Sequence, residues 1–327
     1  MVNEKQLIDV VKKLVSKDDV KYVIGYEKGT YGFQVTPSFA FTSEDADKFI
    51  FSPLCVNNLA VYPMLEEKLP VGKNEEKHSR KIGLIVKGCD SRAVVQIIQE
   101  KGMKRENVVI IGMPCTGIID PKKIKARFPH QIKTVDAEED DEKFVISING
   151  TIHKIPKEEL LFDKCKHCEN PNPVIYDILV GEEVKSTKKE DYEKVKTLEN
   201  KPLKEKWEYW AKQFERCIRC YACREVCPMC YCEECMATQL SPQWIRRSVN
   251  LSENTIWNIM RAYHLAGRCV GCGECERVCP MGIPLTELNK KIEKDIKELF
   301  DYTPGINTEE KPLLAMFKPD DPEEFIL

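Results

Sequence analysis

The stretches CIRCYACREVCP (residues 217–228) and CVGCGECERVCP (residues 269–280) carry the same cysteine pattern. In each, three cysteines are separated by two residues, a fourth follows after three more, and proline comes directly after the fourth. With 16 cysteines among 327 residues, chance does not place this spacing twice in one chain. The same run of cysteines holds [4Fe–4S] clusters in bacterial proteins. The repeat therefore predicts two such clusters in the second half of the chain.

The spacing also predicts which cysteines share a cluster. Three thiolates separated by two residues wrap one cubane because the backbone between them turns tightly, whereas the fourth points away, and in two-cluster ferredoxins it ligates the other cluster. The first cluster is therefore expected on Cys217, Cys220, Cys223 and Cys279. The second is expected on Cys269, Cys272, Cys275 and Cys227. Zinc is the alternative, but it favours two separated CxxC pairs or mixed Cys/His sets.

Length and composition bound the class of protein. A chain of 327 residues is expected to form about two domains. Its net charge of −3 and pI of about 6.1 argue against a nucleic-acid partner. No apolar run approaches the ~20 residues of a membrane span, and the start lacks the apolar core of a signal peptide, so we expect a cytoplasmic protein without a membrane span. In a reducing compartment, metal binding is the default role of so many cysteines.

The segment between the two motifs is long, covering residues 236–268. We predict that Ser241-Pro242 begins one helix in this segment and that Ser252 caps a second. Together with CPMGIPL (279–285), residues 213–290 resemble the α-helical ferredoxin domain of succinate dehydrogenase iron–sulfur subunits and heterodisulfide reductase subunits. The resemblance implies an electron relay, with no substrate chemistry at the clusters.

Further cysteines follow the first motif directly. The sequence CPMCYCEEC contributes Cys230, Cys232 and Cys235, which could form part of another cluster, form a zinc site or be passive. Three thiolates need a fourth ligand. By elimination, Cys55 in SPLCVNNLAVY is the remaining cysteine for that place.

The N-terminal part has the pattern of an α/β domain. Residues 4–16 predict an amphipathic helix, and KIGLIVKG (81–88) and NVVIIGM (107–113) predict strands on either side of a helix-like stretch, which favours a parallel βαβ unit. Asn149-Gly150 between FVISI and TIHKI predicts a hairpin, so we expect a mixed sheet. The predicted domains are an α/β domain with a mixed sheet (1–181), a charged linker (182–212), a mainly α-helical two-cluster ferredoxin domain (213–290) and a C-terminal helix and tail (291–327).

Three motifs of the first domain carry a second resemblance. KGCDSRA (87–93), GMPCTGIID (112–120) and CKHCENPNPVIYDILVG (165–181) resemble the beta subunits of coenzyme F420 hydrogenases and dehydrogenases, which pair a flavin with an iron–sulfur cluster. The order of the parts departs from the formate dehydrogenase beta subunits of that family, in which we expect the ferredoxin motifs to come first. Four cysteines in strand-end or loop contexts suit a third [4Fe–4S] cluster: Cys89, Cys115, Cys165 and Cys168.

The family resemblance implies FAD, and a few residues are candidates to bind it. Asp90, Ser91 and Arg92 open a predicted helix whose free amides could receive a phosphate, with added charge from Lys87 and Arg92. The alternative is an ordinary capped helix. Lys28, in GYEKGTYGFQVTP (25–37), could line the flavin, although a turn-rich hairpin explains this stretch equally well. The chain contains no GxGxxG fingerprint of a Rossmann dinucleotide site.

The sequence predicts no catalytic residues, because none of its five histidines forms a hydrolytic set. It predicts an electron-transfer subunit of an anaerobic oxidoreductase that passes electrons between a flavin and a chain of [4Fe–4S] clusters. The expected partners are other subunits of a hydrogenase, formate dehydrogenase or heterodisulfide-reductase-like complex. One alternative is a flavin-free iron–sulfur adaptor that links such a catalytic subunit to a heterodisulfide-reductase-like core. Another is a zinc-stabilised scaffold.

Overall fold

The computed structural model describes residues 4–30, 34–67, 80–129, 132–133, 135–140, 142–319 and 321. The chain divides into two compact units. The N-terminal unit comprises Met1–Val94 and Met103–Glu190, and the C-terminal unit comprises Val95–Gly102 and Asp191–Leu327. Residues 31–33 of the stretch predicted to line the flavin lie outside the described residues, as do residue 320 and residues 322–327 of the tail.

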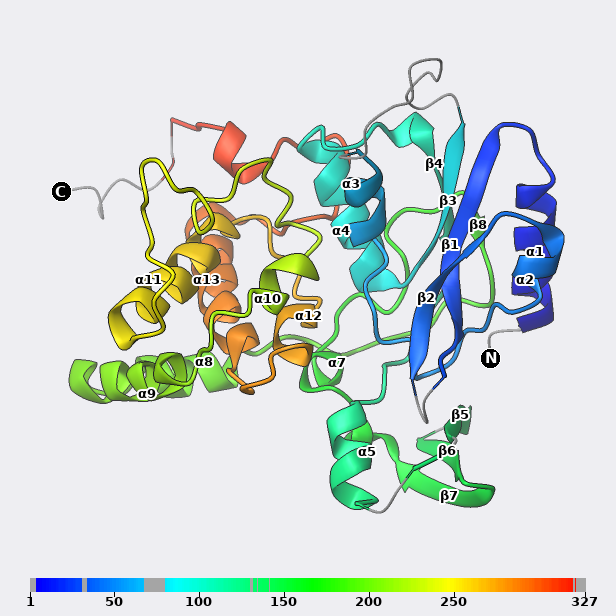
Figure 1. Ribbon diagram of the computed structural model, residues 1–327, viewed down its shortest axis with the longest axis horizontal. Coiled ribbons are helices and arrows are strands. Elements are labelled where there is room, and N and C mark those ends of the chain that lie inside the picture. Colours follow the sequence, from blue (N-terminus) through cyan, green and yellow to red (C-terminus); the bar gives the residue numbers. More distant parts are fainter. Residues whose placement is uncertain are drawn as a thin grey trace. The chain divides into compact units, whose positions relative to one another are not determined.

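A five-stranded mixed sheet forms the centre of the N-terminal unit, with strand order β2-β1-β3-β4-β8 (Figure 1). Strands β1 (Val20–Lys28) and β2 (Val35–Ala40) pair antiparallel. Strands β3 (Lys81–Val86), β4 (Val108–Gly112) and β8 (Ile178–Leu179) continue the sheet in parallel from β1. The predicted mixed sheet is confirmed, with β2 as its antiparallel member.

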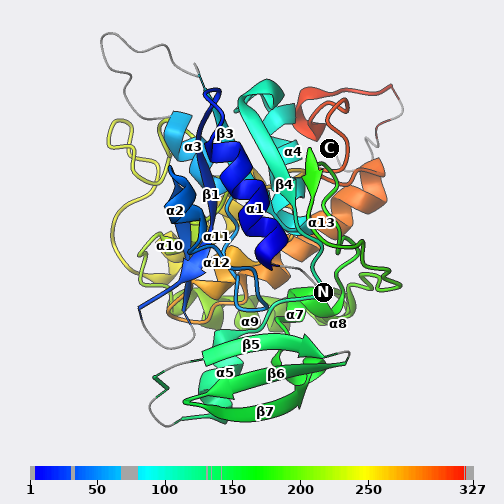
Figure 2. The same ribbon diagram turned by 90° about the vertical axis from the view of Figure 1, so that its right-hand side faces the viewer.

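Helices cover both faces of this sheet. Helix α1 (Glu4–Val15) buries Leu7, Val11 and Leu14, as the periodicity predicts, and lies on one face, while α4 (Gly88–Gln99) lies on the other (Figures 1 and 2). The short helices α2 (Ser43–Ala46) and α3 (Val61–Glu67) complete the first half of the unit. The β3-α4-β4 connection is the predicted parallel βαβ unit. Since β3 and β4 run in the same direction, the segments that follow them leave the sheet at the same end.

The Asn149-Gly150 hairpin belongs to a separate sheet. Strands β5 (Val135–Asp140), β6 (Lys143–Ile148) and β7 (Thr151–Pro156) pair antiparallel in sequence order. Asn149 and Gly150 have φ values of +49° and +84°, the left-handed pair that a two-residue hairpin requires. The predicted hairpin is therefore confirmed, but it does not extend the central sheet. Three short helices flank this small sheet along the chain: α5 (Pro121–Arg127), α6 (Lys157–Leu160) and α7 (Asp163–Lys166).

The C-terminal unit is helical, as predicted. Its longer helices are α9 (Leu203–Glu215), α11 (Leu251–His264) and α13 (Leu285–Phe300), and they meet around Phe214, Ala262 and Leu288. The shorter ones are α8 (Glu193–Glu199), α10 (Ala222–Glu225) and α12 (Glu274–Arg277). Helices α8 and α9 fall mainly within the segment predicted as a charged linker. No helix of the described residues is both long enough and apolar enough to cross a bilayer.

Two predicted helix starts in this unit are wrong. Ser241-Pro242 opens no helix, and residues 240–250 form turns and bends, because this stretch lacks an apolar stripe that a helix could bury. Helix α11 is capped by Asn250 and not by Ser252: the Asn250 side chain accepts a hydrogen bond of 3.0 Å from the backbone N–H of Glu253.

Candidate iron–sulfur centres

A first cavity in the C-terminal unit brings together cysteines from both motifs. It encloses about 340 Å³, counting its open mouth, and its cysteines are Cys217, Cys220, Cys223 and Cys279. The other walls are mainly apolar and aromatic, including Tyr221, Trp257 and Ile283. Three cysteines of the first motif therefore meet the fourth cysteine of the second motif around one space.

A second cavity repeats this arrangement with the roles of the motifs exchanged. It encloses about 380 Å³ on the same measure, and its cysteines are Cys227, Cys269, Cys272 and Cys275. Its walls are more polar than those of the first cavity, since they include Arg261, Asn289, Lys290 and Glu293. Lys290 and Glu293 form an ion pair of 2.6 Å.

Both motifs adopt the same tight turn. The residues on either side of the second cysteine have left-handed φ values: Arg219 at +55° and Tyr221 at +59° in the first motif, Gly271 at +67° and Gly273 at +68° in the second. A one-turn helix follows each turn, α10 or α12, and carries the third cysteine, Cys223 or Cys275. Left-handed residues reverse the chain within few atoms, so the first three thiols of each motif line one cavity.

The spacing of the thiols is wider than a single ion requires. Four thiolates on one zinc ion, at Zn–S distances of about 2.3 Å, have sulfur atoms roughly 3.8 Å apart. Among the residues that the structure describes, no three cysteines place their sulfur atoms within 4.8 Å of one another. A ring of thiols around a larger space suits a cubane, whose iron atoms lie at the corners of a cage.

Hydrogen bonds from neighbouring groups reach some of these sulfur atoms. The side-chain amide of Asn289 donates to Sγ of Cys275 at 3.7 Å, and the backbone N–H of Ile283 donates to Sγ of Cys279 at 3.5 Å. The amide of Asn254 fixes the first motif by donating to the carbonyl oxygen of Cys217 at 2.8 Å. Such contacts orient metal-binding side chains and tune the potential of a bound cluster.

Burial raises the cost of ionising these thiols. It raises the pKa of Cys223 to about 12, while the nearby Arg261 guanidinium acts in the opposite direction. Burial also raises the pKa of Cys275, again against the effect of Arg261. Because metal ligands must be thiolates, iron has to displace the protons of these two cysteines when it binds.

Arg261 belongs to neither motif and stands close to both. It is 5% exposed, and its Nη2 donates to the carbonyl oxygen of Cys223 at 2.9 Å. Burial on its own lowers the pKa of Arg261, but the charges of neighbouring cysteines outweigh this and raise it. These cysteines are Cys275, Cys227, Cys230 and Cys223.

In the N-terminal unit, three segments meet beyond the ends of β3 and β4. The backbone N–H of Cys115 donates to the carbonyl oxygen of Pro171 at 2.9 Å, and that of Val174 donates to Oγ of Ser91 at 2.9 Å. Gly88 permits this packing, since a Cβ atom there would overlap the carbonyl oxygen of Asn170. The segment that follows the CxxC pair is thereby held against the beginning of KGCDSRA (87–93) and of GMPCTGIID (112–120).

This packing gathers cysteines of the predicted third set. Burial raises the pKa of Cys115 to about 12, and the nearby thiols of Cys165 and Cys168 contribute, while the Lys87 ammonium opposes the shift. Lys87 also lies near Cys89, whose charge acts on the pKa of that lysine. Cys165 is 8% exposed and the other three members are partly buried. Cys115 therefore lies near Cys165 and Cys168, and Lys87 lies near Cys89 and Cys115, while a cluster on all four cysteines stays a prediction.

Several residues predicted to bind flavin are engaged elsewhere. The buried Lys87 ammonium donates to the phenol oxygen of Tyr26, to the carbonyl oxygen of Asn57 at 2.8 Å and to the Asp90 carboxylate at 2.9 Å. Asp90 also accepts from the backbone N–H of Lys87 at 3.1 Å, so it caps α4. Ser91 Oγ donates to the carbonyl oxygen of Gly88 at 2.8 Å. The alternative of an ordinary capped helix thus fits this site, with the Asp90 carboxylate near the start of the helix.

Two further flavin candidates lie elsewhere on the N-terminal unit. Arg92 is half-buried on α4, and Lys28 is exposed and forms an ion pair of 2.6 Å with Asp136. The flavin site predicted from these residues stays a prediction.

The extra cysteines have separate surroundings. Cys55 is fully buried in the N-terminal unit, where its Sγ accepts from the backbone N–H of Ser52 at 3.3 Å and burial raises its pKa to about 11. Cys230 forms a thiol hydrogen bond with Cys227, while Cys232 is exposed. Cys235 packs against the apolar core beside the first cavity. A cluster shared by Cys55 and the other three stays a prediction.

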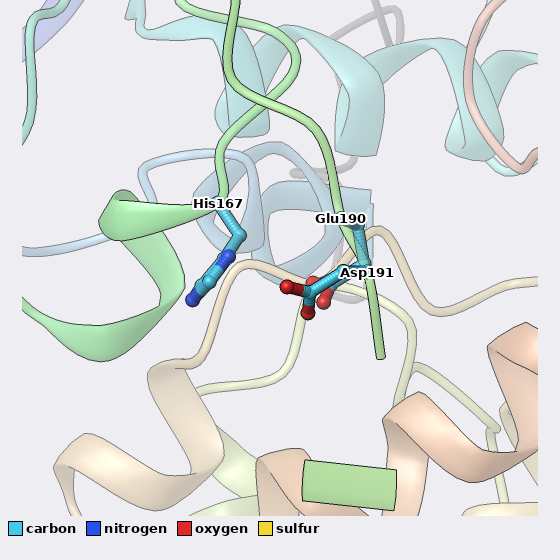
Figure 3. A group of neighbouring side chains, drawn as sticks. All are labelled: His167, Glu190 and Asp191. Carbon is cyan, nitrogen blue, oxygen red and sulfur yellow. The ribbon is translucent and has the colours of Figure 1, made fainter. Parts of the chain in front are cut away.

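His167 lies in the CxxC pair next to two acidic residues. Figure 3 shows its imidazole beside the carboxylates of Glu190 and Asp191, and one ligand atom of each residue lies within 4.8 Å of the others. His167 and Glu190 are exposed, and exposed acidic groups gather in this way without a metal ion. We therefore assign no ion to this group.

The site and the fold define an iron–sulfur protein, and comparisons with known proteins agree. Residues 212–283 match the family model of the 4Fe-4S dicluster domain. The chain is 28% identical over 291 residues to the F420-dependent formate dehydrogenase subunit beta of Methanocaldococcus jannaschii, covering 72% of this chain and 76% of the relative. It is 29% identical over 364 aligned positions to F420-dependent formate dehydrogenase 1 subunit beta of Methanococcus maripaludis, covering 93% of this chain and 91% of the relative.

A solved structure gives a weaker match. A chain of the F420-reducing [NiFe] hydrogenase complex from Methanosarcina barkeri is 14% identical, with a TM-score of 0.36, over 52% of this chain and 64% of that one. The sequence relatives and the dicluster domain fit the F420 dehydrogenase beta-subunit family with an iron–sulfur domain, so the resemblance predicted from the motifs is confirmed.

The alignment with the Methanococcus maripaludis subunit bears on the order of the two regions. It spans 93% of this chain and 91% of that subunit, and an alignment keeps residue order. Residues 217–280 therefore align with a late part of that relative. The expectation that ferredoxin motifs come first in formate dehydrogenase beta subunits stays a prediction.

Arg261 is the residue of this site that sequence reasoning missed. A signal was present: the buried positions of α11 follow helical spacing, and polar side chains occupy several of them, namely Asn254, Asn258 and Arg261. A charge at a position that the periodicity assigns to the core requires a buried counter-charge.

We expect Lys87→Met to destabilise the N-terminal unit by about 3–5 kcal/mol, because it leaves the buried Asp90 carboxylate unpaired. Lys28→Met is the matched control, since it breaks an exposed ion pair that contributes less than about 1 kcal/mol. Hydrogen exchange of the β3 amides is the suitable measurement, because all four tryptophans lie in the C-terminal unit. Equal protection in both variants would contradict the buried pairing.

We expect Gly88→Ala to cost about 1–3 kcal/mol through overpacking and to displace the segment around Asn170. If Cys89, Cys115, Cys165 and Cys168 hold a cluster, iron bound by the N-terminal unit then falls. Gly150→Ala is the control, since its left-handed φ strains the hairpin while no atom lies within 4 Å of the added methyl group. The measurement is iron per chain after anaerobic purification, and an unchanged value in Gly88→Ala would contradict the expected effect.

Proposed function

We propose that this chain carries single electrons through three [4Fe–4S] clusters as a cytoplasmic subunit of an F420-dependent oxidoreductase. The observation that carries the proposal is the meeting of two distant motifs around each of two cavities. Its relatives, named as beta subunits of F420-dependent formate dehydrogenases, support the class of enzyme. The proposed partners are other subunits of a formate dehydrogenase, hydrogenase or heterodisulfide-reductase-like complex.

The proposed ligand sets cross between the motifs. Cys217, Cys220, Cys223 and Cys279 hold the first cluster. Cys269, Cys272, Cys275 and Cys227 hold the second. Cys89, Cys115, Cys165 and Cys168 hold the third, in the N-terminal unit. When bound, these clusters supply one-electron redox chemistry, and the role of the chain is to bind them, keep water from them and set their potentials.

Flavin is a separate part of the proposal, supported by the family resemblance alone. The internal partners of Lys87, Asp90 and Ser91 argue against a phosphate site at the start of α4. This observation favours the second candidate function, a flavin-free iron–sulfur adaptor within the same kind of complex. In both functions the clusters conduct, and the two differ in whether this chain also exchanges electron pairs.

An anaerobic cofactor inventory tests the function. We expect three cubanes of iron and sulfide per chain and no stoichiometric zinc. Acid extraction releases FAD if the chain is a flavoprotein, whereas full iron without FAD establishes the adaptor. Zinc in place of iron would refute electron transfer through this chain.

The crossed ligation has its own test. We expect Cys279→Ser to lose the same cluster as Cys220→Ser, because both residues line the first cavity. Cys272→Ser, from the second cavity, is the contrasting variant. Electron paramagnetic resonance of the reduced proteins compares the three. A Cys279→Ser spectrum that matches Cys272→Ser and not Cys220→Ser would show ligation within each motif.

A further inference from the structure

Arg261 is a buried cation without a carboxylate partner among the described residues. It is 5% exposed, and its one hydrogen bond given by the structure runs from Nη2 to the carbonyl oxygen of Cys223. Its Nε is buried and has no hydrogen-bond acceptor among the described residues. A buried guanidinium costs several kcal/mol unless an anion compensates it. The compensating charge must therefore come from something other than Asp or Glu.

The neighbouring cysteines show where that charge lies. Arg261 lines the second cavity, and it is hydrogen-bonded to the backbone of Cys223, whose side chain lines the first. Its charge acts on Cys223 of the first set and on Cys227 and Cys275 of the second. A cubane on four thiolates carries net negative charge, and each added electron increases it.

We propose that Arg261 is the shared counter-ion of the two cubanes in the C-terminal unit and raises the reduction potential of both. The inference rests on the proposed function, since it requires both clusters to be present. A fixed positive charge favours the more negative, reduced state of each cluster, and in a buried site water screens this effect only weakly. Because one charge acts on both clusters, it shifts their potentials in the same direction.

Lys290 provides a matched control at the same cavity. It also lines the space around Cys227, Cys269, Cys272 and Cys275, but its ammonium pairs with the Glu293 carboxylate at 2.6 Å. Its side chain is 20% exposed, so water and the carboxylate both reduce its effect on a cluster. Removal of this charge is expected to affect the second cluster alone, and less strongly than removal of Arg261.

The experiment is an anaerobic redox titration of the full chain, followed by electron paramagnetic resonance, for wild type, Arg261→Met, Arg261→Lys and Lys290→Met. We expect Arg261→Met to lower the equilibrium constant for reduction of each cluster by at least tenfold. This corresponds to a decrease of about 59 mV in each midpoint potential for one electron. Arg261→Lys keeps the positive charge, so we expect its equilibrium constants for reduction to differ from those of wild type by less than tenfold. Iron and sulfide are measured on every sample.

Several results would overturn the inference. These are unchanged midpoints in a fully loaded Arg261→Met protein, a shift in one cluster alone, or an equal shift in Arg261→Lys. If Arg261→Met assembles no clusters, Arg261→Gln replaces it, because glutamine keeps a donor for the Cys223 carbonyl without the charge. Loss of clusters in Arg261→Gln but not in Arg261→Lys supports the counter-ion, and loss in both refutes it. Wild-type protein without iron would instead refute the proposed function.

Discussion

Burial of ionisable sulfur is the constraint on which the C-terminal unit depends. Two cavities gather eight cysteine side chains, and burial opposes the loss of protons from Cys223 and Cys275 among them. An apolar core alone cannot compensate thiolates, so the unit needs cations inside it. Iron supplies most of that charge in the proposed clusters, and Arg261 adds one further positive charge. The surrounding helices position the groups that complete each cavity, since α11 brings the arginine between the motifs and α13 brings Asn289 to a sulfur atom.

The N-terminal unit meets a similar requirement in another way. Parallel strands β3 and β4 end at the same side of the sheet, and the motifs that follow them meet the segment after the CxxC pair there. Lys87 is the cation of this region, but the Asp90 carboxylate pairs with it inside the protein. Asp90 also caps α4. The sequence resembles the start of a phosphate-binding helix, but the Lys87 ammonium already donates to groups within the protein.

Spacing made the iron–sulfur region predictable, because ligand geometry restricts the sequence itself: the turns around Cys220 and Cys272 repeat at equal intervals in both motifs. Periodicity likewise predicted α1 and the β3-α4-β4 unit. Ser241-Pro242 misled because a capping residue marks a helix only where an apolar face follows. A helix does follow Ser252, but Asn250 two residues earlier is its cap. The roles of Lys87 and Arg261 depend on contacts between segments far apart in sequence. The local sequence shows that such a residue is charged, but it does not show which distant group the charge interacts with.

The contrast between these two cations has a consequence for electron transfer. A paired charge acts on a nearby cluster almost as a dipole, whose effect declines steeply with distance, whereas an unpaired buried charge acts at full strength. Lys87 is paired and Arg261 is not. If both proposed sites hold clusters, Arg261 therefore shifts the potentials of the C-terminal pair more than Lys87 shifts that of the third cluster, because the Asp90 carboxylate offsets most of the charge on Lys87.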